Sequence, residues 1–238
     1  MATTERGTGH REQSWAAVFW DIGGVILDLD SVRDSHRYVI ATLIDEYDVD
    51  ATFEEAADRW RRTLGSYFKE RDGTAFRPAR RVYARVVEDL VGERVPDSEW
   101  QALFQEARER HFRTNPNARE TIATIAETDL HQGVVSDIDA DEGRHILTQF
   151  EVCDYLDAVT TSEEVGRTKP DPAMFRTALD RAGVAPERAV MVGDRYSHDM
   201  AGAARQGIHT VAYGADDGPA VDYVVDDLAE ILDILGVE

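Results

Sequence analysis

Three side chains able to do chemistry follow apolar runs of the sequence. Asp21, Ser136 and Asp194 each come directly after such a run, and Asp199 lies five residues beyond Asp194. Because parallel strands end at one edge of a sheet, we expect these side chains to converge. Carboxylates in a partly desolvated pocket repel each other unless a cation compensates them. Oxygen-only donors without a His or Cys cluster indicate a hard cation, and Mg²⁺ is the default because it keeps coordination sites for water and phosphate.

Lysine is rare in this chain. Of 26 Lys and Arg residues, only Lys69 and Lys169 are lysines, and Lys169 stands in Lys-Pro-Asp-Pro before an expected helix. A compact ammonium group suits a point contact with phosphate, which the planar guanidinium of arginine does not reproduce. The hydroxyl of Ser136 can donate to a phosphate oxygen, and amides around Gly23 and Gly24 can form an anion-binding nest. These features predict a phosphate site.

Strands and helices that must position these residues take turns along the chain. The continuous apolar run at 15–20 predicts a strand buried on both faces. Further strands are expected at 133–136, 158–161, 189–193, 209–212 and 223–225, with helices at 119–127, from about 141, and at 172–182, 201–206 and 228–235. The alternation predicts an α/β fold with a doubly wound parallel sheet of the Rossmann-like type.

An all-helical insertion interrupts this pattern after the first strand. Between about Ser31 and Asn115 no strand is evident, while apolar residues such as Val39, Leu43 and Tyr47 recur three or four positions apart. We expect the insertion to lie over the carboxyl edge of the sheet. The predicted division has three parts. Residues 1–14 form a disordered N-terminal tail, residues 15–30 and 113–238 form the α/β core, and residues 31–112 form the helical cap.

Charge and composition exclude several functions. The chain has 47 acidic against 26 basic residues and a net charge of −21, which opposes binding to nucleic acid or anionic lipid. Abundant acid with little lysine resembles the surfaces of halophilic proteins. Cys153 is the single cysteine, so no internal disulfide is possible and the cytoplasm is the default location. No apolar run approaches the ~18 residues of a membrane span, and no feature indicates an oligomeric state.

Four short segments, taken in order, resemble the motifs of the haloacid dehalogenase-like (HAD) hydrolase superfamily. They are Asp21-Ile-Gly-Gly-Val-Ile, Val-Val-Ser136-Asp137, Lys169-Pro-Asp-Pro and Gly193-Asp194-Arg-Tyr-Ser-His-Asp199. The resemblance spans the core from about Trp15 to the C-terminus, and the insertion lies where that family has its helical C1-type cap. It implies a phosphatase that hydrolyses small phosphorylated metabolites.

The resemblance also implies a role for each matching residue. Asp21 is the expected nucleophile, which attacks a phosphoryl group and forms an aspartyl-phosphate, with Lys169 beside it as the second catalytic residue. The expected phosphate-binding residues are Gly23, Gly24, Ser136, Asp137 and Lys169. The expected Mg²⁺ ligands are Asp21, the main-chain carbonyl of Gly23, Asp194 and Asp199.

One position departs from the family pattern. Gly23 stands where family phosphatases usually carry the Asp that protonates the leaving alcohol, and such assistance is typically worth ~10²–10⁴ in rate. We therefore expect a preference for good leaving groups. Restoring the acid by Gly23→Asp has two expected outcomes: faster hydrolysis of alkyl phosphates, or strain if the turn needs a positive φ.

Two alternative functions of the protein remain open: a metal-independent 2-haloacid dehalogenase-like hydrolase and a non-catalytic phospholigand-binding protein.

Overall fold

A parallel sheet forms the centre of the computed structural model, which describes residues 14–237. Its six strands lie in the order β3-β2-β1-β4-β5-β6. They are β1 (Ala17–Trp20), β2 (His131–Ser136), β3 (Ala158–Thr161), β4 (Ala189–Gly193), β5 (His209–Tyr213) and β6 (Tyr223–Val225). The strand order reverses between β1 and β4, which is where such sheets bind ligands. The predicted doubly wound α/β fold is confirmed.

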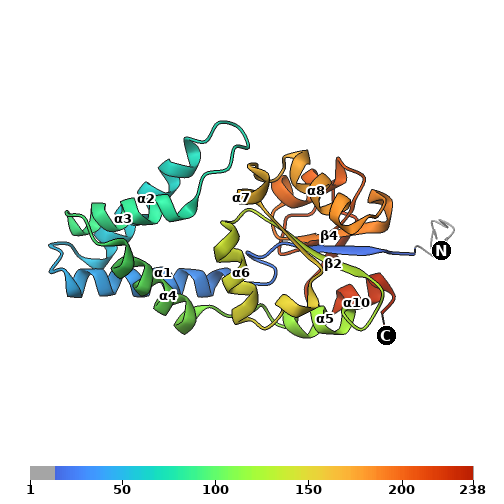
Figure 1. The fold of residues 1–238 in the computed structure, drawn as a ribbon, viewed down its shortest axis with the longest axis horizontal. Coiled ribbons are helices and arrows are strands. Elements are labelled where there is room, and N and C mark those ends of the chain that lie inside the picture. Colours follow the sequence, from blue (N-terminus) through green and yellow to red (C-terminus); the bar gives the residue numbers. More distant parts are fainter. Residues whose placement is uncertain (1–13, 238) are drawn as a thin grey trace, which may run out of the picture.

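Side chains of β1 alternate between the two faces of this sheet. Val18 and Trp20 pack into one hydrophobic cluster and Phe19 into another, and all three are fully buried. Figure 1 shows α8 (Pro172–Ala182) on one side of the sheet and α5 (Ala118–Ile125) with α10 (Glu230–Leu235) on the other. Burial on both faces explains why the strand reads as a continuous apolar run.

The helices between β1 and β2 have a hydrophobic cluster of their own. They are α1 (Leu29–Glu46), α2 (Phe53–Lys69), α3 (Ala79–Val91) and α4 (Asp97–His111). The cluster includes Val39, Trp60, Val86 and Phe104, and Figure 1 shows these helices as a lobe beside the sheet. Separate clusters support the proposed division into cap and core. The proposed tail, residues 1–14, lies almost wholly outside the described residues.

Helix α1 begins at Leu29, two residues before the expected position. The side chain of Asp28 caps it by accepting from the Asp30 N–H at 2.9 Å. A carboxylate at this position satisfies a helix N–H that has no partner within the helix. The cap therefore joins the core almost directly after the Asp21 loop.

Hydrogen bonds hold the segment between α2 and α3, residues 70–78, against the core. We call this segment the strap. The Thr168 N–H donates to the Thr74 carbonyl at 2.8 Å, and the Thr74 hydroxyl donates to the Asp171 carboxylate at 2.6 Å. These core residues belong to segment 166–171, which also carries the lysine of the predicted site. The strap thus links the position of the cap to that site.

Helices α6 (Ala140–Gln149), α7 (Ser162–Val165) and α9 (Ala201–Ala204) complete the core. A π-helical turn, Tyr196–Met200, precedes α9 where the sequence predicted no helix before Ala201. Such turns often occur at functional sites. Among the helices of residues 14–237, none has both the length and the apolar composition to cross a membrane.

Candidate active site

Lys169 is the centre of a buried charge cluster. Its ammonium group lies 2.9 Å from Asp21 Oδ2 and 2.6 Å from Asp199 Oδ1, and it donates to the Val135 carbonyl at 2.9 Å. The side chains of Lys169 and Asp199 are fully buried. Burial alone would lower the pKa of Lys169, but the surrounding carboxylates, Asp199 before Asp21, raise it above its ordinary value. The lysine is therefore held as a cation, and its contacts orient the two carboxylates.

Asp194 brings a third carboxylate to the same place. One oxygen each of Asp21, Asp194 and Asp199 lies within 4.8 Å of the others. Burial, together with the neighbouring charges of Asp21 and Asp199, raises the pKa of Asp194 to about 6. Asp194 Oδ1 is buried and accepts no hydrogen bond from the described residues. An oxygen left this way, among all-oxygen donors with excess negative charge, fits a divalent cation.

Two glycines make room for these carboxylates. A Cβ atom at Gly24, where φ is +81°, would lie 2.1 Å from Asp194 Oδ2, and one at Gly193 would lie 2.3 Å from the Cβ of Asp199. Neither position accepts a side chain without displacing a candidate metal ligand. The two glycines therefore allow the β1 and β4 loops to approach each other at the switch point.

Gly23 is different from its neighbour. It does not have a positive φ, and a Cβ built there meets only Leu29 Cδ2, at an ordinary 3.8 Å. The expectation that a side chain here could be strained is therefore wrong. Within the described residues the Gly23 N–H donates no hydrogen bond and its carbonyl accepts none. Both backbone groups are thus available to a ligand.

The predicted phosphate donors at the end of β2 lie beside Asp21. Ser136 is buried, and its hydroxyl has no hydrogen-bond partner within residues 14–237. The Asp137 carboxylate is already occupied: Oδ1 accepts from the Lys169 N–H at 2.7 Å and the Ser162 hydroxyl at 2.9 Å. The group that Asp137 can offer an anion is therefore its backbone N–H, which has no acceptor among the described residues.

Arg195 and His198 complete this edge, although the sequence analysis gave neither a role. Arg195 Nη2 donates to Asp137 Oδ2 at 3.2 Å, and its backbone N–H donates to Asp199 Oδ2 at 2.9 Å. Burial lowers the pKa of His198, and the neighbouring Arg195 lowers it further. Both residues lie within the motif that begins at Gly193, and this position is the feature of the sequence that could have identified them as site residues.

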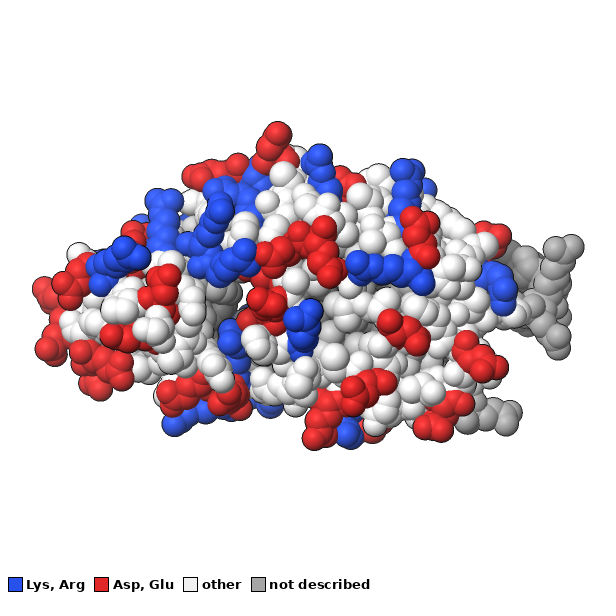
Figure 2. Space-filling model, in the orientation of Figure 1, with Lys and Arg blue, Asp and Glu red and all other residues white. Residues whose placement is uncertain are grey.

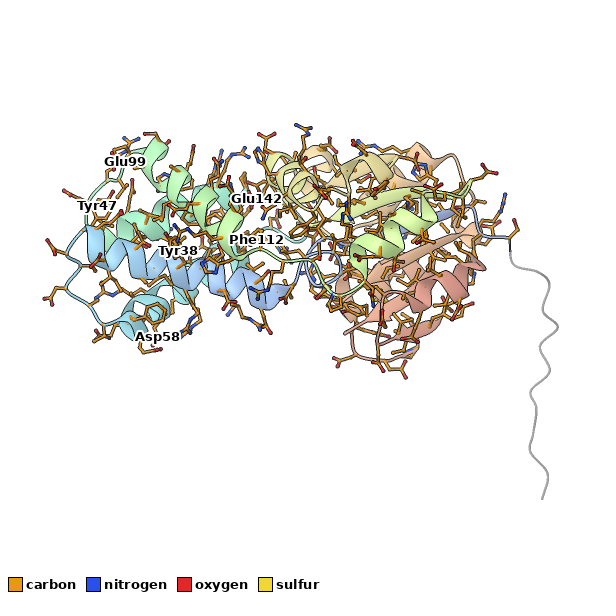
Figure 3. The ribbon with its side chains drawn as sticks, turned by 90° about the horizontal axis from the view of Figure 1, so that it is seen from below. Tyr38, Tyr47, Asp58, Glu99, Phe112 and Glu142 are labelled. Carbon is orange, nitrogen blue, oxygen red and sulfur yellow. The ribbon has the colours of Figure 1, made fainter. Side chains whose placement is uncertain are left out.

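A cavity of about 1180 Å³ lies between the cap and the carboxyl edge of the sheet. Core residues Asp137, Arg195 and His198 line one side, and cap residues such as Tyr83 and Phe112 line the other. Figure 3 shows Phe112 and Glu142 where the cap meets the core, and Figure 2 shows the molecule hollowed between the two lobes. The cavity gives a small molecule a partly apolar space beside the charge cluster.

Known proteins share both the sequence pattern and the fold. A ribulose-1,5-bisphosphate 5-phosphatase of Halopiger xanaduensis is 25% identical over 92% of this chain and 98% of its own. A glyceraldehyde 3-phosphate phosphatase of Pyrococcus furiosus is 31% identical, over 52% of this chain and 55% of its own. The crystal structure of a HAD phosphatase from Thermococcus onnurineus superposes with a TM-score of 0.71 at 26% identity, covering 94% of this chain and 99% of that one.

The family model for haloacid dehalogenase-like hydrolases matches residues 77–213, which is more than half of the chain. The matched region includes β2, β4 and their loops, and therefore Ser136, Lys169, Asp194 and Asp199. Asp21 precedes it, but the parallel pairing of β1 with both β2 and β4 brings Asp21 to the same edge. Motifs, fold and family model agree, and this chain belongs to the haloacid dehalogenase-like hydrolases.

Proposed function

We propose that this protein is a Mg²⁺-dependent phosphatase of small phosphorylated metabolites. The observation that carries the proposal is the buried contact of Lys169 with Asp21 and Asp199, next to the Asp194 oxygen that accepts no hydrogen bond from the described residues. The relatives support a phosphorylated sugar as substrate, since two of them are named for the phosphates of glyceraldehyde and ribulose.

Asp21 is the nucleophile in this proposal. One of its carboxylate oxygens attacks phosphorus, the bond from phosphorus to the leaving oxygen breaks, and the phosphoryl group stays on Asp21 as an acyl phosphate. Water then attacks that phosphorus, the bond from phosphorus to the Asp21 oxygen breaks, and inorganic phosphate leaves with the protons of the water while Asp21 returns to a free carboxylate. The Ile22 N–H, 2.8 Å from Asp21 Oδ1, and the Lys169 ammonium fix the orientation of the carboxylate. Lys169, the Ser136 hydroxyl and the N–H groups of Gly23 and Asp137 are the proposed contacts of the phosphoryl oxygens. The Gly24 N–H, expected from the sequence to join them, already donates to the Leu27 carbonyl at 2.9 Å.

Asp21, Asp194, Asp199 and the Gly23 carbonyl are the proposed Mg²⁺ ligands. The free Asp194 oxygen and the all-oxygen donor set fit this ion. When bound, Mg²⁺ neutralises charge on the transferring phosphoryl group. Gly193 and Gly24, which admit no side chain, keep the carboxylates close enough to share one ion.

The dehalogenase alternative uses the same nucleophile but no metal. A reaction without a metal does not explain why three carboxylates converge beside one lysine, or why a buried oxygen of Asp194 accepts no hydrogen bond from the described residues. The non-catalytic alternative rests on Gly23 alone, whereas the contact of Asp21 with Lys169 supports a nucleophile at Asp21 whatever residue stands at position 23.

Phosphate release tests the proposal and separates these alternatives. Purified protein is assayed with p-nitrophenyl phosphate and a panel of sugar phosphates, with Mg²⁺ or with EDTA, and chloride release is measured from 2-chloropropionate. We expect phosphate release that depends on Mg²⁺, and no chloride. Chloride release in EDTA would establish the dehalogenase, and neither product would establish a binding protein.

Two variants assign the roles. Asp21→Asn should lower turnover by more than about 10³-fold because an amide is not a competent nucleophile. Asp194→Ala should weaken activation by Mg²⁺ while the melting temperature in EDTA stays the same or rises, because a repelling buried charge is removed. Asp129→Asn, an exposed carboxylate outside the site, is the matched control and should change neither. Unchanged turnover in Asp21→Asn contradicts the mechanism.

A further inference from the structure

The cations that line the cavity between cap and core are of two kinds. Most have a carboxylate within 4.0 Å: these are Arg77, Arg80, Arg108 and Arg195. Lys69 and Arg71 also line the cavity, and no carboxylate of residues 14–237 lies within that distance of either. Acidic residues outnumber basic ones 47 to 26 in this chain. Two cations facing one cavity without a carboxylate partner are therefore available to an anion from solution.

Arg71 is held beside the proposed phosphate site. Its Nη1 donates to the Thr168 hydroxyl at 3.2 Å, which is the one hydrogen bond of its side chain within the described residues. Thr168 directly precedes Lys169, so the guanidinium of Arg71 lies over the segment that carries the buried lysine. A guanidinium has five N–H donors, and most of those of Arg71 face no protein acceptor.

Lys69 is at the last residue of α2, two positions before Arg71. It is exposed at the cavity rim. Lys169 itself is buried against Asp21 and does not line the cavity, but its neighbour Thr168 does, as does Lys69. Figure 2 shows Lys and Arg side chains gathered on the cap beside the hollow.

We propose that Arg71, assisted by Lys69, is a second anion subsite, and that the substrates of this enzyme carry a second negative group besides the phosphate that is cleaved. That group is a carboxylate or a second phosphate, since both accept forked hydrogen bonds from a guanidinium. The proposal rests on the proposed function for the first phosphate. It assigns Arg71 to specificity: the residue binds the part of the substrate that does not react.

Binding to the Asp21→Asn variant tests the subsite without turnover. Calorimetry compares two matched pairs of probes in the presence of Mg²⁺. Glycerol 3-phosphate against 3-phosphoglycerate tests a carboxylate, and glucose 6-phosphate against glucose 1,6-bisphosphate tests a second phosphate. We expect tighter binding of the doubly anionic member in at least one pair. Adding Arg71→Gln should weaken that member about tenfold, the loss typical of one charge-assisted contact, and change its singly anionic partner less than about twofold.

Two further variants separate a subsite from other roles of Arg71. Arg94→Gln removes the same charge from an exposed cap position outside the cavity and should leave both members of each pair unchanged. Arg71→Lys keeps the charge and should recover part of the preference. Equal weakening of both members in Arg71→Gln would show that Arg71 only positions the strap, and equal affinity for both members in the parent would also overturn the subsite. Failure of the proposed function is distinct, since it appears as absent phosphate release in the natural protein.

Discussion

Gly23 occupies the position from which a side chain would protonate the leaving oxygen. Family phosphatases usually carry a carboxylic acid at this position, whereas here φ is not positive and a Cβ atom would make one ordinary contact, with Leu29 Cδ2 at 3.8 Å. The loop therefore has the room and the conformation for a side chain, but it has none. Within the proposed mechanism, protonation of the leaving oxygen by this residue is absent, and the leaving group's own pKa controls the first step.

The natural protein should hydrolyse aryl phosphates much faster than alkyl phosphates for this reason. Gly23→Asp should narrow the gap by accelerating alkyl esters up to ~10²-fold, at the low end of what general acid catalysis supplies. The measurement is kcat for p-nitrophenyl phosphate and glycerol 3-phosphate, with melting temperature measured on the same samples. Gly23→Asn is the matched control, because it has the same size and cannot donate a carboxyl proton.

Two outcomes would contradict this account of Gly23. Equal rates for aryl and alkyl esters in the natural protein would show that the cap or the substrate already supplies the proton. The same acceleration in Gly23→Asn would show that the gain comes from packing against Leu29, the neighbour of that Cβ, and not from an acid.

At the scale of elements, the strap connects the cap to the core. The Thr74 hydroxyl donates to Asp171, whose other oxygen caps α8 by accepting from the Ala173 N–H at 2.9 Å. The same strap places Arg71 over Thr168. Cap position and the proposed anion subsite therefore depend on a few hydrogen bonds between the two lobes.

Thr74→Val removes one of these bonds while keeping the shape of the side chain. Loss of a hydrogen bond costs on the order of 1 kcal/mol, so backbone amides of Phe76 and Thr168 should exchange about fivefold faster. Hydrogen exchange with mass spectrometry of peptides covering residues 72–77 and 166–170 measures this. Thr63→Val is the matched control: its hydroxyl donates to Asp89 at 3.3 Å within the cap, so the strap should be unaffected. No change in Thr74→Val would show that the other contacts hold the strap alone.

Sequence reasoning found the core elements because each carries a local signal. The run ending at Trp20 is apolar on both faces, and Asp21 follows where the chain must leave the sheet. The strap has no such signal, since Thr74 and Asp171 are 97 residues apart and polar residues at both positions suit any loop. Arg71 is likewise one of many arginines until the fold shows that no carboxylate of residues 14–237 lies within 4.0 Å of it. Contacts between the lobes thus depend on tertiary structure that periodicity does not encode.

At the scale of the whole molecule, the sign of the net charge differs from the sign of the charge beside the cavity. Acidic residues outnumber basic ones 47 to 26, and Lys and Arg side chains gather on the cap beside the cavity (Figure 2). Such an arrangement repels anions at long range and attracts them near the site. Screening by salt reduces the long-range repulsion first, because exposed charges are separated by water.

Salt should stabilise this protein. Three exposed carboxylates, Asp45, Glu46 and Asp50, lie close together at the C-terminal end of α1 and just after it. They repel one another, and acidic residues at a helix C-terminus also interact unfavourably with the helix dipole. The Debye length falls from about 10 Å at 0.1 M to about 3 Å at 1 M salt, so such repulsion is largely screened at the higher concentration. We expect the melting temperature to rise between 0.1 M and 2 M KCl. Replacing the three residues by Asn, Gln and Asn should raise it most at 0.1 M and flatten the dependence. If the melting temperature rises equally with KCl in the variant and in the natural protein, the cause is preferential exclusion of salt from the protein surface and not screening at these residues. A melting temperature that is independent of KCl in the natural protein would contradict the halophilic interpretation.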